Sequence, residues 1–90
     1  MAFLIDATMK GYRVLGIRTF HSKKGTEGRS IDVYKDGRNA EISCTDANLI
    51  PYVDGLQQMD IVNLDVVAVS GKERSYIMLV NSPVLVDRQA

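Results

Sequence analysis

Apolar and polar residues alternate with a period of two along most of this chain, a pattern typical of strands that bury one face of a β-sheet. The clearest run is Ser30–Lys35, in which Ile31 and Val33 fall on the inward face. A second run, Arg38–Cys44, follows after the dipeptide Asp36-Gly37. Because Asp-Gly readily adopts the positive φ angles of a type I′ turn, the two runs are predicted to form an antiparallel hairpin.

The chain before this hairpin is predicted to form a long, bent first strand over Tyr12–Phe20. This stretch is rich in β-branched, aromatic and basic residues, and Gly16 inside it indicates a bulge or a bend. The preceding residues, Met1–Met9, either extend this strand or form a separate edge strand. The segment His21–Arg29 is polar and contains two glycines, so we expect a mobile hairpin tip there.

The second half of the chain is predicted to contain a short plug and further strands. A helical turn that begins near Thr45 is expected to stop by Ile50, because Pro51 follows. Apolar residues around this turn are expected to close one end of the sheet. The remaining predicted strands cover Met59–Ser70, Arg74–Val80 and, as a last short segment, Val84–Val86.

Together these elements predict an all-β protein with one domain over residues 1–90. The expected architecture is a small five-stranded antiparallel Greek-key barrel, OB-fold-like, because a bent first strand and a plug between the third and fourth strands fit that plan. An SH3-like barrel is the competing topology.

Two of the predicted strands, Ile61–Val69 and Tyr76–Val80, are apolar on much of both faces. An antiparallel strand that buries both faces needs a cover on the second one, so we expect a homo-oligomer, with a homodimer favoured. A chain of 90 residues, 46% of them apolar, builds only a modest core, and association often stabilises chains of this size.

The chain contains no apolar run near the roughly 18 residues that a membrane helix requires. Its first residues are also too few for the core of a secretory signal. We therefore expect a soluble, cytoplasmic protein without a membrane partner. Cys44 is the single cysteine and lies in an alternating run, which predicts a buried structural thiol.

Charge is distributed unevenly although the formal net charge is zero. From Lys10 to Arg29 there are six basic residues and one acidic residue, whereas Ser30 to Val66 contains two basic and seven acidic residues. A dipole of this kind can hold a polyanion at one side while the molecule remains soluble. It is equally compatible with two solvated surfaces of opposite sign.

The chain carries few of the groups that catalysis needs: one His, one Cys, and none of the spacing motifs of metal, phosphate-loop or dinucleotide sites. We expect no enzyme activity, no cofactor and no metal. Binding is better supported, because aromatic and basic residues, the combination that holds single-stranded nucleic acid, alternate around two hairpins. The candidate residues are Arg18, Phe20, Lys23, Lys24, Arg29 and Tyr34 around the first hairpin, and Arg74 and Tyr76 at the second.

Several of these residues also have an interpretation without a ligand. Strand aromatics such as Phe20 and Tyr76 commonly pack against neighbours, and Lys23 and Lys24 can simply keep a hairpin tip solvated. Tyr34 shares its face with Ser30 and Asp32 rather than with the apolar residues of its strand, which predicts an exposed ring.

In plan, residues 11–86 resemble the small single-stranded-DNA-binding proteins of phages and mobile elements, such as the helix-destabilising proteins of filamentous phages. The resemblance rests on the bent first strand, the aromatic-bearing second strand, the basic tip Lys23-Lys24-Gly25, the plug with Asp54-Gly55, and the closing hairpin from Lys72 to Tyr76. It implies a homodimer whose tyrosines and loop cations hold DNA without sequence preference, during replication or transfer. The neutral charge and the few aromatics depart from the family pattern.

Two functions of different classes therefore remain. The first is sequence-tolerant binding of single-stranded DNA, with RNA as a variant. The second is a small-barrel protein-interaction or phage assembly module that uses its apolar later strands and binds no nucleic acid.

Overall fold

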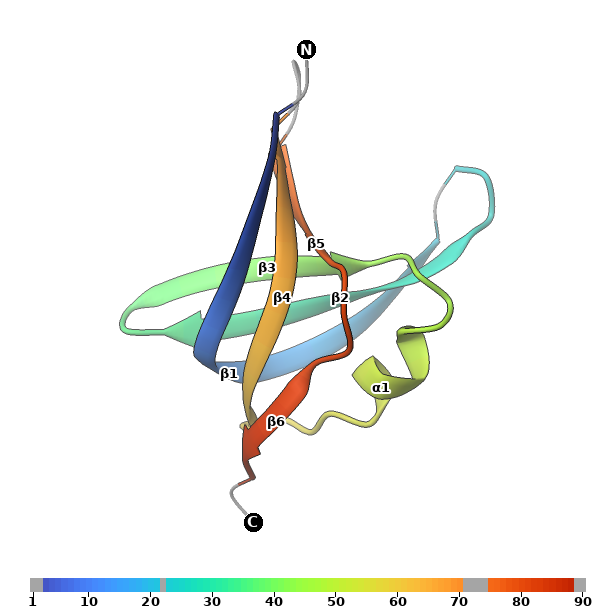
Figure 1. Cartoon of the computed structure of the whole chain (residues 1–90). Coiled ribbons are helices and arrows are strands. Elements are labelled where there is room, and N and C mark those ends of the chain that lie inside the picture. The colour runs from blue at the N-terminus through green and yellow to red at the C-terminus, as the bar shows by residue number, and fades with distance from the viewer. Residues whose placement is uncertain (1–2, 22, 71–74, 89–90) are drawn as a thin grey trace.

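The computed structural model describes residues 3–21, 23–70 and 75–88, without the side chains of residues 3 and 4. These residues form strands and one short helix (Figure 1). The elements are β1 (Phe3–His21), β2 (Glu27–Lys35), β3 (Arg38–Cys44), α1 (Ile50–Asp54), β4 (Ile61–Ser70), β5 (Ser75–Leu79) and β6 (Val84–Asp87). No helix in these ranges is long and apolar enough to cross a membrane.

Five strands close into a barrel in the order β1-β2-β3-β5-β4, and β4 pairs back onto β1. The expected all-β, five-stranded, OB-fold-like barrel is confirmed. The expectation of uniformly antiparallel pairing is wrong at one place, because β3 and β5 are parallel at Ile42↔Ile77 and Ser43↔Met78. Strand directions cannot alternate all the way around a closed ring with an odd number of strands, so one parallel pair is unavoidable.

Strand β1 is long enough to pair with two neighbouring strands. Its first half pairs with β4, from Phe3↔Ser70 to Arg13↔Ile61, and its second half pairs with β2. The two halves meet near Gly11, whose φ of +71° favours glycine. The bulge expected at Gly16 is present, since the register with β2 shifts between Val14 and Gly16. Residues 3–9 therefore extend the first strand, as one of the two alternatives predicted.

The predicted β2–β3 hairpin is confirmed in its register and its turn. Asp36 and Gly37 have φ angles of +52° and +80°, as a type I′ turn requires, and Lys35 lies opposite Arg38. Strand β2 begins at Glu27 rather than at Ser30, so the loop after β1 is shorter than predicted.

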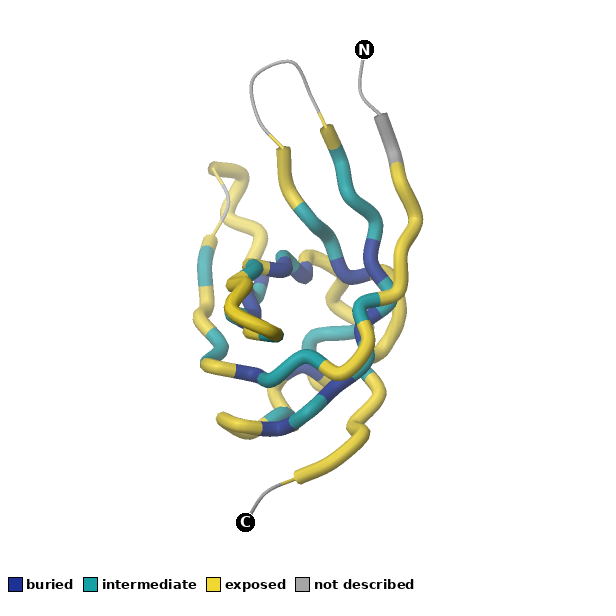
Figure 2. The backbone as a smooth tube through the Cα atoms, turned by 90° about the vertical axis from the view of Figure 1, so that its left-hand side faces the viewer, coloured by how far each residue is buried: buried dark blue, intermediate teal, exposed yellow. Residues whose placement is uncertain are grey.

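The core fills the barrel and contains the inward residues that the alternation predicted. Its buried members are Val14, Ile31, Val33, Ile42, Cys44, Val53, Val62, Leu64, Val66 and Leu79. Cys44 is fully buried, as expected, and burial raises the pKa of its thiol. Buried residues are concentrated within the barrel (Figure 2).

Helix α1 closes one end of the barrel, but the role expected of Pro51 was wrong. Proline does not stop a helical turn here; it lies in the first turn of α1, where its missing N–H needs no helical partner. Val53 is the buried residue of this helix, whereas Tyr52 is 61% exposed. The plug therefore depends on one face of a single short helix.

Beyond the barrel, β1, β4 and β5 continue side by side as a three-stranded extension toward the N-terminus (Figure 1). We call this extension the arm and define it as Phe3–Thr8, Val66–Ser70 and Ser75–Leu79. Most of it is half-buried or exposed (Figure 2). The expectation that β4 is apolar on both faces holds only in the arm, because Asn63 and Asp65 alternate with buried residues lower in the strand.

Candidate nucleic-acid interface

An open hollow of about 290 Å³ lies between the β1–β2 hairpin and the start of β5. Phe20, at the end of β1, and Tyr76, at the start of β5, both contribute to its lining. The remaining lining residues are Ser43, Thr45 and Met78. We call this hollow the hairpin groove. It brings together one predicted aromatic from each hairpin, two residues that are far apart in the sequence.

The ring of Phe20 has a defined place because it covers Gly28 on the neighbouring strand. Phe20 lies opposite Gly28 in the β1–β2 register, and a Cβ atom at Gly28 would come within 2.5 Å of the Phe20 Cζ. A side chain at position 28 would therefore displace the Phe20 ring. The ring remains only half-buried and so has surface available for a ligand.

Tyr76 is 41% exposed. Its ring is therefore accessible and is not packed away against neighbouring residues. Met78 shares its face of β5 two residues further along, and its Sδ lies 4.0 Å from the Thr45 hydroxyl. The groove therefore has aromatic and thioether surface together with the hydroxyls of Ser43 and Thr45. Such a lining provides apolar stacking surface and hydrogen-bonding groups for a planar ligand.

Arg18 lies beside the groove, in an adjoining hollow of about 280 Å³ that also includes Phe20 and Ser43. Its Nη2 atom is 3.1 Å from Asp32 Oδ1 and 3.2 Å from Glu41 Oε2, and the bond to Asp32 is the main reason that its pKa is raised. Asp32 and Glu41 are directly opposite each other on β2 and β3. The middle of this face therefore carries more negative than positive charge.

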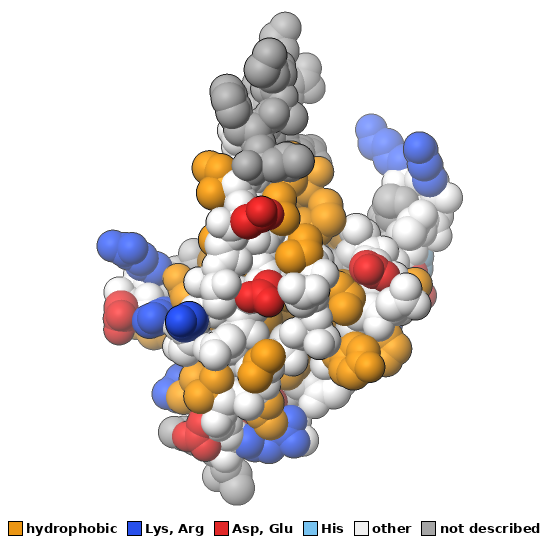
Figure 3. Space-filling view, in the orientation of Figure 1, with side chains coloured by type: hydrophobic (Ala, Val, Ile, Leu, Met, Phe, Trp, Pro, Cys, Tyr) orange, Lys and Arg blue, Asp and Glu red, His pale blue; other side chains and the backbone are white. Residues whose placement is uncertain are grey.

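Lys23 and Lys24 lie in the turn between β1 and β2, and both are exposed. Figure 3 shows basic side chains at the tip of this hairpin, away from the acidic groups of the barrel. The described residues provide neither lysine with an ion-pair partner. Both ammonium groups are therefore available to an anionic ligand that enters the hairpin groove.

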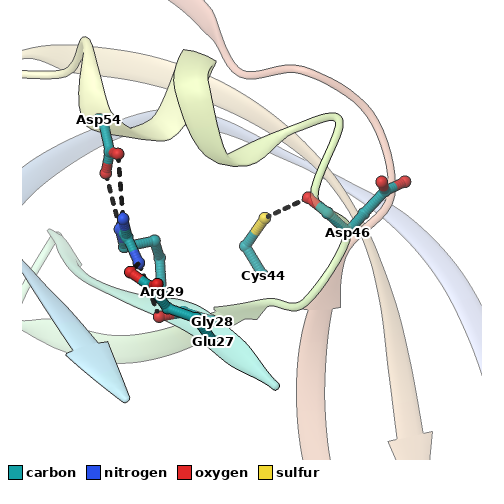
Figure 4. A network of polar contacts seen from close by, with 6 residues as sticks. All are labelled: Glu27, Gly28, Arg29, Cys44, Asp46 and Asp54. Atoms are coloured by element: carbon teal, nitrogen blue, oxygen red, sulfur yellow. Dashed lines mark hydrogen bonds and ion pairs between the residues drawn. The ribbon is translucent and has the colours of Figure 1, made fainter. Parts of the chain in front are cut away.

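Arg29 has a different environment from the one its sequence position suggested. It lies within β2, not in the loop, and its side chain is only 13% exposed. Its Nε and Nη2 donate to the two carboxylate oxygens of Asp54 at 2.8 and 3.2 Å, and its Nη1 donates to Glu27 at 2.7 Å (Figure 4). These bonds raise the pKa of Arg29 and tie α1 to the barrel. A phosphate would have to displace two carboxylates to reach this guanidinium.

Tyr34 is 40% exposed, as its alternation predicted. It lies at the other end of β2, opposite Arg13 and Asn39. Six strand positions separate it from Gly28, which corresponds to about 20 Å at the usual rise of an antiparallel strand. Tyr34 and the hairpin groove are therefore two separate places on the surface. Arg74, the remaining predicted residue, lies outside the described residues.

Three groove residues were missed by the sequence analysis: Ser43, Thr45 and Met78. The alternation of β5 places Met78 on the same face as Tyr76, which is a signal that the sequence does contain. Ser43 and Thr45 join them only because β3 and β5 become neighbours when the barrel closes.

In the described ranges no group of three or more His, Cys, Asp or Glu side chains is arranged to hold a metal ion. Comparison with known proteins adds nothing to the geometry: no family model, no curated protein and no solved structure matches this chain.

Proposed function

We propose that this protein binds single-stranded DNA without sequence preference, with the hairpin groove as the base-binding site. The proposal rests on one observation above all. Phe20 and Tyr76, from separate hairpins, line one open hollow at the base of the β1–β2 tip, whose lysines are exposed and have no ion-pair partner among the described residues. Stacking surface next to exposed positive charge is the combination that single strands require.

Each part of the interface has a distinct task in this proposal. A base stacks on Phe20 or Tyr76, which is tolerant of sequence because every base has a π-face. Lys23 and Lys24 neutralise the adjoining phosphates and release their counterions. The Asp32–Glu41 pair repels the backbone from the middle of the sheet face, and Arg18 offsets only part of that repulsion. The backbone is therefore directed along the rim of the groove.

The resemblance to phage and mobile-element proteins suggests the biological role of this activity, which is to coat single strands during replication or transfer. RNA carries the same phosphates and stackable bases, so the groove offers no means of rejecting it. Binding to the two polymers is expected to be of comparable strength.

Changing Lys23 and Lys24 together to Ala tests the electrostatic part of the proposal. Each phosphate contact on a single strand contributes about 0.7 to the slope of log K against log salt, so the double variant should lose a slope of about 1.4 and bind more weakly at low salt. Fluorescence anisotropy with a labelled oligothymidylate, from low to moderate salt, measures both quantities.

Arg88 is unsuitable as a control position because its guanidinium donates to Asp60. The control is therefore the double change of Lys23 and Lys24 to Arg, which preserves both charges and should give the wild-type slope of log K against log salt. An unchanged slope and affinity in the Ala variant would refute the site. Equal affinity for duplex and single-stranded DNA would argue against the stacking part.

The protein-interaction alternative is favoured by a different observation, the apolar C-terminal strand. Strand β6 pairs only with β4, and its residues Val84, Leu85 and Val86 are 58%, 43% and 54% exposed. An exposed apolar edge strand is a template for pairing with another chain. If the wild-type protein binds no single strand at any salt concentration, this edge becomes the best-supported functional surface.

We further propose that the chain forms a homodimer through the arm. Ile5 is 61% exposed there, and Val67, Val69, Ile77 and Met78 are only half-buried. Among the described residues the arm part of β1 pairs with β4 on one edge, and no strand pairs with its other edge. Two copies can therefore pair these outer edges around a two-fold axis and form one continuous sheet. Such an interface covers apolar surface and closes without forming fibres.

Sedimentation at concentrations of tens of micromolar should give the mass of a dimer for the wild-type chain. Ile5→Lys should shift the population to monomers, because it places two charges close to the two-fold axis. Asn48→Lys, on an exposed loop far from the arm, is the matched control and should leave the dimer intact. A wild-type monomer at these concentrations would contradict the proposal.

A further inference from the structure

A second cluster of cations lies at the opposite end of the sheet from the hairpin tip, around the β2–β3 turn. Tyr12, Lys35, Asp36 and Arg38 line an open hollow of about 280 Å³ there. Figure 3 shows basic side chains gathered at this end of the molecule as well. We call this hollow the turn pocket. The predicted Asp36-Gly37 turn already places Lys35 near Arg38, whereas the fold brings Tyr12 to them from the first strand.

Lys35 and Arg38 lie directly opposite each other in the β2–β3 register. Like charges in that position destabilise a hairpin. The described part of the chain nevertheless supplies no carboxylate within ion-pair distance of either residue. Asp36 contributes to the same hollow, yet it forms no ion pair with them. Among the described residues the pocket thus holds two cations and one carboxylate, and neither cation is engaged in an ion pair.

The ammonium group of Lys35 is held in place by contacts that do not neutralise it. Its Nζ donates to the Lys10 carbonyl oxygen at 2.7 Å and lies 5.5 Å from the centroid of the Tyr12 ring, within the range of a cation–π contact. A lysine ammonium has three donors, so two of them remain for a ligand. Arg38 is exposed, and its guanidinium offers a planar fork of donors.

We propose that the turn pocket binds a phosphate group. A fixed ammonium and a free guanidinium are the donors that phosphate oxygens accept most strongly, and a hollow of this size is below the usual range for drug-sized ligands. Bound phosphate would also remove the repulsion between Lys35 and Arg38. Arg13 lies across from Tyr34 on the neighbouring strand and adds to the positive potential.

The identity of that phosphate rests on the proposed function. Tyr34 immediately precedes Lys35 and exposes its ring on the opposite face of β2, so a single strand that stacks one base on Tyr34 passes around the end of the hairpin to place a phosphate in the turn pocket. The hairpin groove lies about 20 Å away along β2, a span of several nucleotides. One strand therefore contacts the two sites at once, which fits the roughly 4 to 16 nucleotides that such barrels occupy.

Titration of ¹⁵N-labelled protein with inorganic phosphate tests the pocket independently of DNA. Amide shifts should move at residues 35–39 and stay constant at residues 20–24. Lys35→Gln with Arg38→Gln should weaken phosphate binding about tenfold or more, since hydrogen bonds to charged groups contribute roughly 1.5–3 kcal/mol. Arg38→Gln alone changes an exposed side chain without an internal partner and provides a variant that keeps the fold.

Asp36→Asn is a control that should change phosphate affinity in the opposite direction. Asn tolerates the positive φ of this turn position, and removal of the carboxylate should strengthen phosphate binding. The proposal would be overturned if phosphate left the amide chemical shifts of residues 35–39 unchanged, or if all of these variants bound phosphate with equal affinity.

Oligothymidylates distinguish a nucleic-acid phosphate from a free one. A strand of about twelve nucleotides should shift amides at both sites, and the Lys35→Gln/Arg38→Gln variant should lose a salt slope of about 1.4. If phosphate binds and no oligonucleotide does, the pocket is confirmed as an anion site and the proposed function fails. If the oligonucleotide binds with an unchanged slope in that variant, the assignment of the pocket to the strand is wrong.

Discussion

Replacing Phe20 or Tyr76 by Ala is expected to weaken single-strand binding roughly 5- to 150-fold for each ring, because one stacked base contributes about 1–3 kcal/mol. The loss should be similar at every salt concentration, since the rings carry no charge. Tyr76→Phe should retain most of the affinity, because the ring and not the hydroxyl does the stacking. Anisotropy with the same oligothymidylate measures the effect.

Tyr52→Ala is the matched control for these changes. Tyr52 is the most exposed tyrosine of the described residues, with 61% of its surface accessible, and it lies on α1 and does not line the groove. Its removal should leave binding unchanged. Should Tyr52→Ala cost as much affinity as Tyr76→Ala, stacking would not be confined to the groove.

The second large effect is expected on stability, at the contact between Asp60 and Arg88. Asp60 is 1% exposed, and its carboxylate accepts bonds from Arg88 Nε and Nη2, both at 3.1 Å, and from the Gln57 N–H at 2.8 Å. Its backbone carbonyl also accepts a bond from the Val14 N–H at the bulge of β1. Arg88 thus fastens the end of the chain to the loop before β4.

The Arg88 guanidinium is the main cause that lowers the pKa of Asp60. A carboxylate with a lowered pKa stabilises the folded state above its unfolded pKa of about 4, and this stabilisation is lost as the pH falls through the lower, folded value. Arg88→Ala should therefore lower the melting temperature at pH 7 by roughly 4–8 °C or more. Below about pH 4 the wild-type and variant curves should converge.

Thermal melts followed by circular dichroism between about pH 2 and pH 7 measure this difference. Arg38→Ala provides the comparison, because Arg38 is exposed and forms no ion pair within the described residues. Its melting temperature should equal or slightly exceed that of the wild type at every pH, because the change also removes the repulsion with Lys35. A constant gap between Arg88→Ala and the wild type down to pH 2 would show that Arg88 acts through packing and not through the Asp60 carboxylate.

Cations at the two ends of the β2–β3 sheet differ from the cation at its middle in their relation to acidic neighbours, and this difference bears on where a polyanion can lie. At the middle of the face, Arg18 is already engaged by Asp32 and Glu41. At the hairpin tip and at the turn pocket, the described cations lack such partners. A strand that touches both ends and avoids the middle follows from this charge distribution.

Local features of the fold could be predicted from the sequence because each depends on residues that are close along the chain. Alternation of period two fixed the inward faces of β2 and β3, including buried Cys44 and exposed Tyr34. Asp36-Gly37 fixed the turn between them, and Gly16 indicated the bulge in β1. The sequence also determined that the chain forms a five-stranded barrel, since it fixed the number of strands and the position of the plug.

The partners of individual side chains were decided only by the tertiary structure. The sequence showed Arg29 as a loop cation, but α1 brings Asp54 against it and the ion pair removes it from the surface. Lys35 and Arg38 seemed part of an acidic half, yet the fold places them beside Tyr12. Phe20 and Tyr76 meet in one groove because β5 closes the barrel against β3. Period and turn chemistry determine which face a residue occupies, whereas barrel closure between distant strands determines what it touches.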